Sequence, residues 1–282
     1  MLIEQTSLIE GFKTNGLYRL KYPADLRVSV IKALESWKRF VALPNSVTDQ
    51  FPYDKGVGYE HQKGTGPTDD RKQDFHFTFD GADLLSGMVD GCSDESLRSV
   101  SRGLIDAAGG LVEHLTPSVS SFAQDIETHF GLGGFKDELL ASKGTWFVRF
   151  LYYPGNRKVG EATAVPHVDK SGITCHLFES APGLQGLGYT DKKWFDTPVS
   201  DTETVIFPGY QLQYISEGKI NALCHRVVAN EETAQSGRYS MVVFFSLKNH
   251  PKYDKNSRGR LQDQEPGFNY GMPFEELRGQ FK

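Results

Sequence analysis

Short strand-like segments dominate the chain after about residue 144. They are rich in β-branched and aromatic residues and are separated by Gly, Pro, Asp and Asn. The segments are TWFVRFLYYPG, GITCHLFE, GLQGLGY, TVIFPG, INALCHRVVAN and RYSMVVFFSL. Several short strands at this spacing favour a β-sandwich or barrel over βαβ units. We therefore predict an all-β C-terminal half.

The N-terminal half carries helical periodicity instead. Apolar residues along 24–42 recur on one face of a helix. A second helical pattern covers 94–130, where Pro117 predicts either a kink or a break into two helices. Between these patterns, residues 51–74 are rich in Gly, Asp, Lys and Pro, which predicts a long loop. That loop is expected to end in a short alternating segment at 75–79.

The net charge bears on the partners of the chain, and the cysteines bear on its redox compartment. The net charge of -5 and the pI of about 5.9 give no reason to expect a nucleic acid or an anionic membrane. The three cysteines, Cys92, Cys175 and Cys224, lie far apart and predict free thiols in a reducing compartment. No segment has the pattern of a signal peptide or of a membrane span, which needs about 18 apolar residues. We therefore expect a cytoplasmic protein, and the oligomeric state stays open.

The segment AVPHVDKSG places His167 and Asp169 two positions apart. In an extended chain, residues i and i+2 point to the same side, so this pair can face one metal ion. The best third ligand is His225, because it lies in another strand-like segment of the same half. Two histidines and one carboxylate form the facial set of non-haem Fe(II) oxygenases. A tetrahedral zinc site remains chemically possible.

Arg238 and Ser240 form a second i, i+2 pair, thirteen residues after His225. A guanidinium offers a planar fork to a carboxylate, and a hydroxyl can add a hydrogen bond. An arginine among Val, Met and Phe would be costly to bury without an anion. A dicarboxylate that chelates iron at one end and meets Arg238 at the other would fit, and 2-oxoglutarate is such a molecule.

Residues 145–247 resemble the isopenicillin N synthase-like branch of the Fe(II)/2-oxoglutarate oxygenases. In chain order, the resemblance rests on FLYYPG, HVDKSGIT, GLQGLGYTDKKWFDTPV, FPGYQLQYISEGKINALCHRV and RYSMVVFF. Residues 56–60 and 70–77 resemble the N-terminal half of the family more weakly. The resemblance implies a mainly β fold with flanking helices (α+β), built on a double-stranded β-helix, or jelly roll.

The resemblance also implies functional residues and cofactors. The implied iron ligands and catalytic residues are His167, Asp169 and His225. The implied 2-oxoglutarate-binding residues are Arg238, Ser240 and Tyr153. Fe(II), 2-oxoglutarate and O2 would then be the cofactors of an enzyme that oxidises a C–H bond of a small molecule, by hydroxylation, desaturation or ring closure.

Substrate-binding residues are harder to assign. Three positions depart from the family pattern, namely Leu151, Tyr210 and His176, and the last stands where an apolar residue usually lines the co-substrate pocket. In this family the pocket is built from N-terminal loops, here 53–79, and from the C-terminal tail. The candidate substrate-binding residues are Tyr59, Arg71, His76 and His176. The polar character of the loop suggests a polar or amino-acid-derived small molecule.

Three other functions stay open at this point. The chain can be an iron oxidase of the same fold that needs no 2-oxoglutarate, in which Arg238 and Ser240 hold a carboxylate of the substrate. It can be a non-enzymatic module that binds a small molecule on the same barrel. It can also be a zinc hydrolase.

We expect one single-domain enzyme with three parts. Residues 1–143 would form a helical region that carries the substrate-pocket loops. Residues 144–248 would form the catalytic core, and 249–282 a polar tail with a short helix after Pro273.

Overall fold

The computed structural model describes residues 7–62, 71–248 and 276. The helix expected after Pro273 lies, apart from Glu276, outside the described residues. The helices are α1 (Leu8–Thr14), α2 (Ala24–Val41), α3 (Asn45–Thr48), α4 (Ala82–Gly91), α5 (Glu95–Phe130), α6 (Phe135–Ala141), α7 (Tyr210–Ile215) and α8 (Glu231–Ser236). The strands are β1 (Tyr18–Lys21), β2 (Gly58–Gln62), β3 (Lys72–Phe77), β4 (Phe147–Tyr153), β5 (Ala162–His167), β6 (Ile173–Glu179), β7 (Leu184–Leu187), β8 (Trp194–Asp196), β9 (Glu203–Pro208), β10 (His225–Val228) and β11 (Arg238–Phe245).

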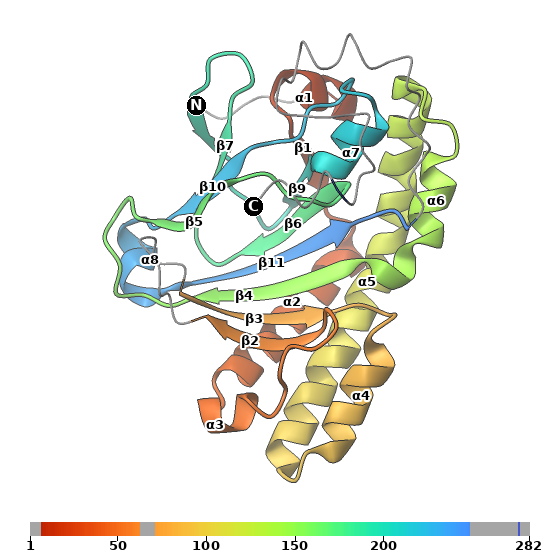
Figure 1. Cartoon of the computed structure of the whole chain (residues 1–282). Helices are drawn as coiled ribbons and strands as arrows, with labels where there is room; N and C mark the ends of the chain where they lie inside the picture. The colour runs from red at the N-terminus through yellow and green to blue at the C-terminus, as the bar shows by residue number, and fades with distance from the viewer. Residues whose placement is uncertain (1–6, 63–70, 249–275, 277–282) are drawn as a thin grey trace.

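Two antiparallel sheets form the β part of the molecule. The large sheet has seven strands in the order β1-β9-β6-β11-β4-β3-β2, and the small sheet has four in the order β5-β10-β7-β8. Helices α2 and α5 pack on one side of the large sheet, while the small sheet lies on the other side (Figure 1). This arrangement confirms the mainly β fold with flanking helices that the sequence predicted.

Helix α5 runs unbroken from Glu95 to Phe130, although it contains Pro117. Its N-terminus is capped by the side chain of Asp94, and its C-terminus by Gly131 in the left-handed region (φ +68°). Of the two alternatives that Pro117 left open, a kink or a break, the break into two helices does not occur. Both turns that flank Pro117 bury apolar side chains, and tertiary packing of this kind stabilises a helix beyond its local propensity.

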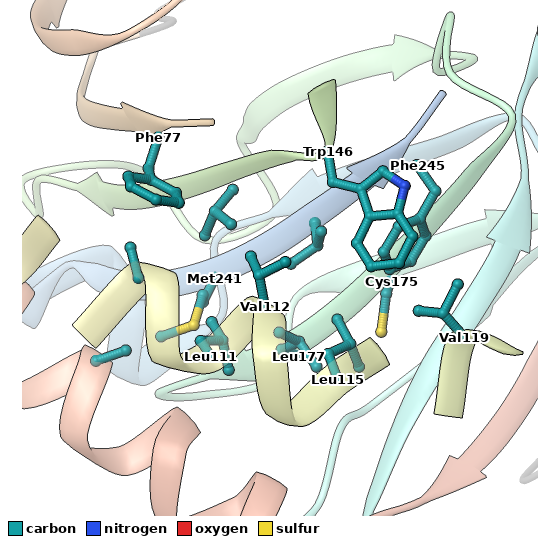
Figure 2. Close-up of a cluster of buried hydrophobic side chains, with 14 of the residues drawn as sticks. Phe77, Leu111, Val112, Leu115, Val119, Trp146, Cys175, Leu177, Met241 and Phe245 are labelled. Atoms are coloured by element: carbon teal, nitrogen blue, oxygen red, sulfur yellow. The ribbon is translucent and has the colours of Figure 1, made fainter. Parts of the chain in front are cut away.

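The hydrophobic core fills the space between α5 and the large sheet. Figure 2 shows side chains of α5, including Leu115, packed against Cys175 and Leu177 of β6 and against Met241 and Phe245 of β11. Successive side chains of a strand point to opposite faces, so the residues between these core positions face the other way. Strands β6 and β11 therefore supply core contacts with one face and leave their second face for the space between the sheets.

The predicted loop at 51–74 contains a β-hairpin arm that sequence composition did not reveal. Strand β2 and the start of β3 lie inside this range, and β3 pairs with β4 to extend the large sheet. The rings of Tyr59 and Phe75 pack on Phe40 of α2, with ring centroids 5.5 and 5.3 Å apart. The prediction was wrong here because contacts with a distant helix outweighed the local abundance of Gly, Asp and Pro.

Two further expectations concern cysteines and membranes. Cys92, Cys175 and Cys224 are free thiols, as predicted. Within the described part of the chain, no helix has the length and apolar character needed to cross a membrane.

We predict that Leu115→Ala lowers the free energy of unfolding by about 2–5 kcal/mol, because it leaves a cavity in a fully buried site. Urea denaturation of both proteins would measure the loss. The matched control is Val28→Ala on α2, whose side chain is 68% exposed and which should change the free energy by less than about 0.5 kcal/mol. Equal losses in the two variants would contradict this account of the core.

Candidate metal centre and its pocket

His167, Asp169 and His225 converge on one point. His167 ends β5, and His225 begins β10 directly opposite it in the antiparallel pair. The Nε2 atoms of His167 and His225 lie 3.6 and 3.7 Å from the two carboxylate oxygens of Asp169. One ligand atom from each residue lies within 4.8 Å of the others. The geometry therefore brings together the three residues that the sequence singled out.

Hydrogen bonds behind this centre fix the direction of each ligand. Nδ1 of His167 lies 2.7 Å from the carbonyl oxygen of Val165, and Nδ1 of His225 lies 3.2 Å from that of Leu223. A carbonyl oxygen only accepts, so each Nδ1 carries the hydrogen and each Nε2 keeps a free lone pair. The hydroxyl of Thr174 donates to Oδ2 of Asp169 at 2.5 Å. Both imidazoles are thus oriented for coordination.

Burial and mutual charge set the protonation states of the three ligands. Burial lowers the pKa of His225 to about 4, so this ring is neutral at pH 7. Burial opposes charge on His167 as well, but the hydrogen bond and charge of Asp169 raise the pKa of His167. Burial also disfavours ionised Asp169, yet His225, His167 and Thr174 together hold the pKa of Asp169 well below its usual range. An ionised carboxylate beside imidazole nitrogens is a donor set that fits Fe(II).

The three ligands line a pocket between the two sheets. The large sheet contributes the side chains of Lys72, Arg149, Leu151, Tyr153, Thr174, His176, Phe207, Ser240, Val242 and Phe244. The small sheet and the segment after β5 contribute Ala164, His167, Asp169, Leu184, His225 and Val227. Tyr153, His176 and Ser240, all candidate binding residues, therefore line the same pocket as the metal ligands, from the opposite wall.

Comparison with known proteins places this arrangement in a superfamily. Residues 146–247 match the family model of the 2OG-Fe(II) oxygenase superfamily. The matched segment is similar to the 2OG-Fe(II) oxygenases. It contains all three metal ligands and both residues of the predicted carboxylate clamp, so the resemblance inferred from the motifs is confirmed.

Relatives by sequence are plant enzymes. The chain is 30% identical over 137 residues to flavonol synthase 1 from Crocosmia x crocosmiiflora, which covers 48% of this chain and 40% of that protein. It is 29% identical over 145 residues to flavonol synthase/flavanone 3-hydroxylase from Eustoma exaltatum subsp. russellianum, covering 51% of this chain and 40% of that protein. The chain thus spans about two-fifths of the length of these curated relatives.

Solved structures with the same fold cover most of the chain. A full-length Neurospora crassa protein in complex with alpha-KG superposes with a TM-score of 0.71 at 18% identity, covering 89% of this chain and 84% of that one. A putative 2OG-Fe(II) oxygenase family protein from Caulobacter crescentus superposes with a TM-score of 0.70 at 24% identity, covering 86% and 81%. These likenesses confirm the jelly-roll core expected from the sequence.

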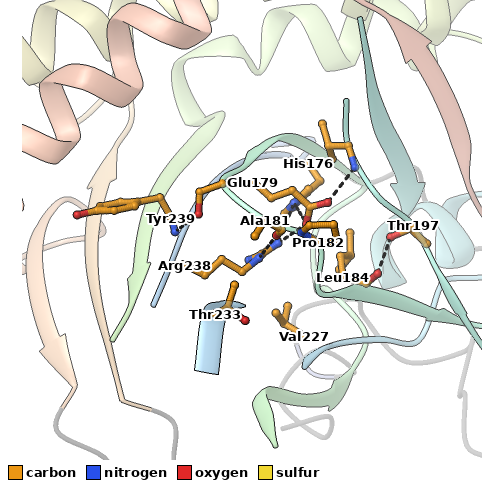
Figure 3. A network of polar contacts seen from close by, with 12 residues as sticks. His176, Glu179, Ala181, Pro182, Leu184, Thr197, Val227, Thr233, Arg238 and Tyr239 are labelled. Carbon is orange, nitrogen blue, oxygen red and sulfur yellow. Dashed lines mark hydrogen bonds and ion pairs between the residues drawn. The ribbon is translucent and has the colours of Figure 1, made fainter. Parts of the chain in front are cut away.

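Arg238, the predicted clamp residue of the oxygenase segment, is paired with an internal carboxylate. The guanidinium is buried, donating from Nε to the carbonyl of Ala181 at 3.0 Å and from Nη2 to Glu179 (Figure 3). Glu179 also accepts from the backbone N–H of Val199 at 2.9 Å and lies 3.5 Å from Nε2 of His176. Nη1 of Arg238 is buried without a hydrogen-bond partner. Sequence reasoning missed Glu179, and the available signal was a carboxylate at the end of a strand-like segment, three positions after His176.

Tyr59 and Arg71, two candidate substrate-binding residues, lie away from the pocket. The ring of Tyr59 is buried in the core, and its hydroxyl donates to the side chain of Gln73 at 2.7 Å. Arg71 donates to the carbonyl of Asn156 at 3.0 Å in an exposed contact. Neither side chain lines the pocket. Their role in substrate binding stays a prediction.

The two histidine candidates differ in position. His76 is buried between the rings of Tyr53 and Phe147, with ring centroids 5.0 and 4.8 Å away, and does not itself line the pocket. His176 does line it, next to Glu179. Of the four candidates, only His176 therefore reaches the space beside the metal ligands.

Sequence reasoning also missed Arg149, which lines the pocket from β4. The signal was present in the segment FVRFLYY, where Arg149, Leu151 and Tyr153 alternate along one face of a strand. Because Tyr153 had been assigned to the pocket, the same alternation places Arg149 there.

We predict that Glu179→Gln destabilises the protein by about 3 kcal/mol at pH 7, because it leaves the buried guanidinium of Arg238 without its anion. Burial disfavours ionised Glu179, but His176 and Arg238 hold the pKa of Glu179 down at about 2, below its ordinary value of 4.5. The stabilisation by the ionised carboxylate is therefore complete above about pH 4.5 and is lost as the pH falls toward 2.

Denaturant titrations of both proteins between pH 7 and pH 3 would test this dependence. The difference in the free energy of unfolding between the original protein and Glu179→Gln should shrink by up to about 1.4 kcal/mol per pH unit below pH 4.5. The control is Glu113→Gln, which removes an exposed partner of Lys143 and should cost less than about 1 kcal/mol at every pH. A difference for Glu179→Gln that does not change with pH would contradict the predicted pairing.

Proposed function

We propose that this chain is an Fe(II)- and 2-oxoglutarate-dependent oxygenase that oxidises a C–H bond of a small molecule. The observation that carries the proposal is the convergence of His167, Asp169 and His225 in a pocket between two sheets. The superfamily of residues 146–247 supports it, as do relatives named flavonol synthase and 2-oxoglutarate-dependent dioxygenase.

The chain would supply three ligands on one side of the metal. When bound, Fe(II) supplies O2 activation: with 2-oxoglutarate as co-substrate, one oxygen atom ends in succinate, CO2 is released, and the other atom oxidises the substrate. His167 and His225 present Nε2 because backbone carbonyls hold their Nδ1 hydrogens. The Thr174 hydroxyl keeps the Asp169 carboxylate turned toward them. A facial set of this kind leaves three coordination positions open.

The co-substrate would be held at the end of the pocket where Ser240 and Tyr153 lie. Nη1 of Arg238 is a buried donor without a partner, and the distal carboxylate of 2-oxoglutarate would supply the missing acceptor. Glu179 and the carbonyl of Ala181 would keep the guanidinium fixed while this happens.

The remaining functional assignments are also proposals. Residues 144–248 would be the catalytic core, residues 1–143 the supporting scaffold, and 249–282 a tail. The free thiols of Cys92, Cys175 and Cys224 fit a reducing compartment such as the cytoplasm. The substrate would be polar or amino-acid-derived, and its oxidation a hydroxylation, desaturation or ring closure.

One observation favours a second candidate, an iron oxidase that uses no 2-oxoglutarate. Arg238 is already paired with Glu179, and its side chain does not line the pocket. In that case the clamp would be a structural ion pair, and Ser240 would contact the substrate itself.

We predict that the protein binds one Fe(II) and forms succinate from 2-oxoglutarate in air, and that His225→Ala loses both properties. Removal of one of three ligands should weaken iron binding by at least about 100-fold, since even residues behind the ligands affect affinity by 10–100-fold. Anaerobic Fe(II) titration and succinate assay would measure this. The exposed His114→Ala variant is the matched control. Full iron occupancy in His225→Ala would remove this histidine from the site.

We predict that Arg238→Met weakens 2-oxoglutarate binding about ten- to a hundredfold and leaves Fe(II) affinity intact, because a charge-assisted hydrogen bond to the co-substrate is lost. Binding of 2-oxoglutarate to the Fe(II)-loaded protein would measure the change. An unchanged affinity would favour the oxidase in place of the 2-oxoglutarate-dependent enzyme.

A further inference from the structure

The pocket contains a second guanidinium whose charge has no anionic partner among the described residues. Arg149 projects from β4 between the rings of Phe147 and Phe244, each centroid 5.3 Å from its guanidinium carbon. Its Nε atom is buried and makes no hydrogen bond. We propose that Arg149 binds a carboxylate of the substrate, so that the substrate is an organic acid. This inference rests on the proposed function and names its substrate class.

Arg149 is half-buried and its guanidinium lies against two aromatic rings, with its buried Nε left without an acceptor, so the site is incomplete. The two rings supply a cation–π attraction, but they offer no acceptor to the N–H groups. Buried polar atoms in native proteins are almost always paired, and an unpaired one in a pocket indicates a missing ligand. A carboxylate is the acceptor whose geometry matches the guanidinium fork.

Two polar residues on the adjacent strand β3, His76 and Asp74, also have buried atoms without hydrogen bonds. His76 lies directly opposite Arg149 in the β3–β4 pair, and Asp74 lies opposite Leu151, so these side chains are on the same face of the sheet. Both nitrogens of His76 and Oδ1 of Asp74 are buried without hydrogen bonds, as is Nε of Arg149. Among the described residues, Asp74 forms no ion pair with Arg149, whose charge is therefore left for another acceptor.

The position of Arg149 separates it from the proposed co-substrate end. Along the β4–β11 pair, Arg149 lies opposite Val242, whereas Arg238 lies opposite Tyr153. Four residues of antiparallel strand span roughly 13 Å. Arg149 thus lines the pocket, with the metal ligands on the opposite wall, whereas Arg238 does not line it and lies beside Tyr153, which does. Two distinct anions, the co-substrate and the substrate, can be bound in it together.

The pocket-lining side chains near Arg149 indicate the polarity of the rest of the substrate. Val242 and Phe244 continue the same row of β11, and Phe207 lines the pocket next to His225, with its ring 4.8 Å from the imidazole. These side chains are apolar. The fitting molecule is a carboxylic acid whose apolar body extends from Arg149 toward the metal ligands.

The test uses Fe(II)- and 2-oxoglutarate-loaded protein with phenylacetate and hexanoate as probes, and phenylacetamide and hexanamide as their neutral counterparts. Calorimetry without O2 would measure affinity, and succinate release in air would measure stimulation of turnover. We expect at least one acid to bind at least about tenfold more tightly than its amide. Arg149→Met should reduce the affinity for the acid to that for the amide, and Arg149→Lys should restore part of it.

The control is Arg27→Met, which removes an arginine that also stacks on an aromatic ring, that of Tyr22, but lies outside the pocket and pairs with Asp201. It should leave the affinity for the acids unchanged. Arg149→Met should also keep the Fe(II) affinity and the 2-oxoglutarate affinity of the original protein, which shows that the metal site and the co-substrate site are intact.

Three results would overturn the inference while leaving the proposed function standing: no acid binds better than its amide, Arg149→Met keeps full affinity for the acids, or that variant loses 2-oxoglutarate affinity instead. The last result would make Arg149 a co-substrate ligand. Conversely, Arg149-dependent binding of acids by a protein that forms no succinate would uphold the inference about Arg149 and reject the proposed oxygenase.

Discussion

The antiparallel pairing of β11 with β4 on one side and β6 on the other is the constraint on which the rest of the structure depends. It fixes which side chains of these strands face α5 and which face the pocket. Met241 and Phe245 pack into the core, while Ser240 and Val242 line the pocket. A shift of one residue would exchange these two sets, burying polar groups under α5 and placing core residues beside the metal ligands. Stability and function therefore require the same register.

Arg238 and Arg149 differ in how the fold matches their charge. Arg238 is matched by Glu179, whose carboxylate is also bound by the backbone of Val199. Such a pair recovers much of the cost of desolvation only when both partners are present. A dicarboxylate would thus accept a hydrogen bond from Nη1 of Arg238, whose charge is already paired with Glu179. Arg149 lacks an internal carboxylate, which is why it is the better position for an anion from outside.

Hydrogen bonds with neighbouring groups orient the three metal ligands. Carbonyl groups of Val165 and Leu223 orient the imidazoles, and Thr174 orients the carboxylate of Asp169. These contacts come from the same strands and adjoining segments that carry the ligands, so folding of the two sheets and assembly of the site are one event. The oxygenase segment, residues 146–247, accordingly holds the metal ligands, the clamp and Arg149 together.

The sequence by itself determined the features that depend on local spacing. The helical period predicted α2 and α5, and the i, i+2 pairs placed His167 with Asp169 and Arg238 with Ser240, because the directions of neighbouring side chains follow from backbone geometry alone. The order of the motifs then identified His225 as the third ligand. These assignments needed no knowledge of which strands are neighbours.

Only the tertiary structure decided the features that depend on which distant segments meet. It placed a strand pair in the Gly- and Asp-rich stretch at 51–74, moved Tyr59 into the core against Phe40, and paired Arg238 with Glu179, 59 positions away. It also left Arg149 facing aromatic rings, with no anionic partner in the part of the chain that the structure describes. Local patterns specify the direction of a side chain, but its partner is set by sheet register and packing, which are properties of the whole chain.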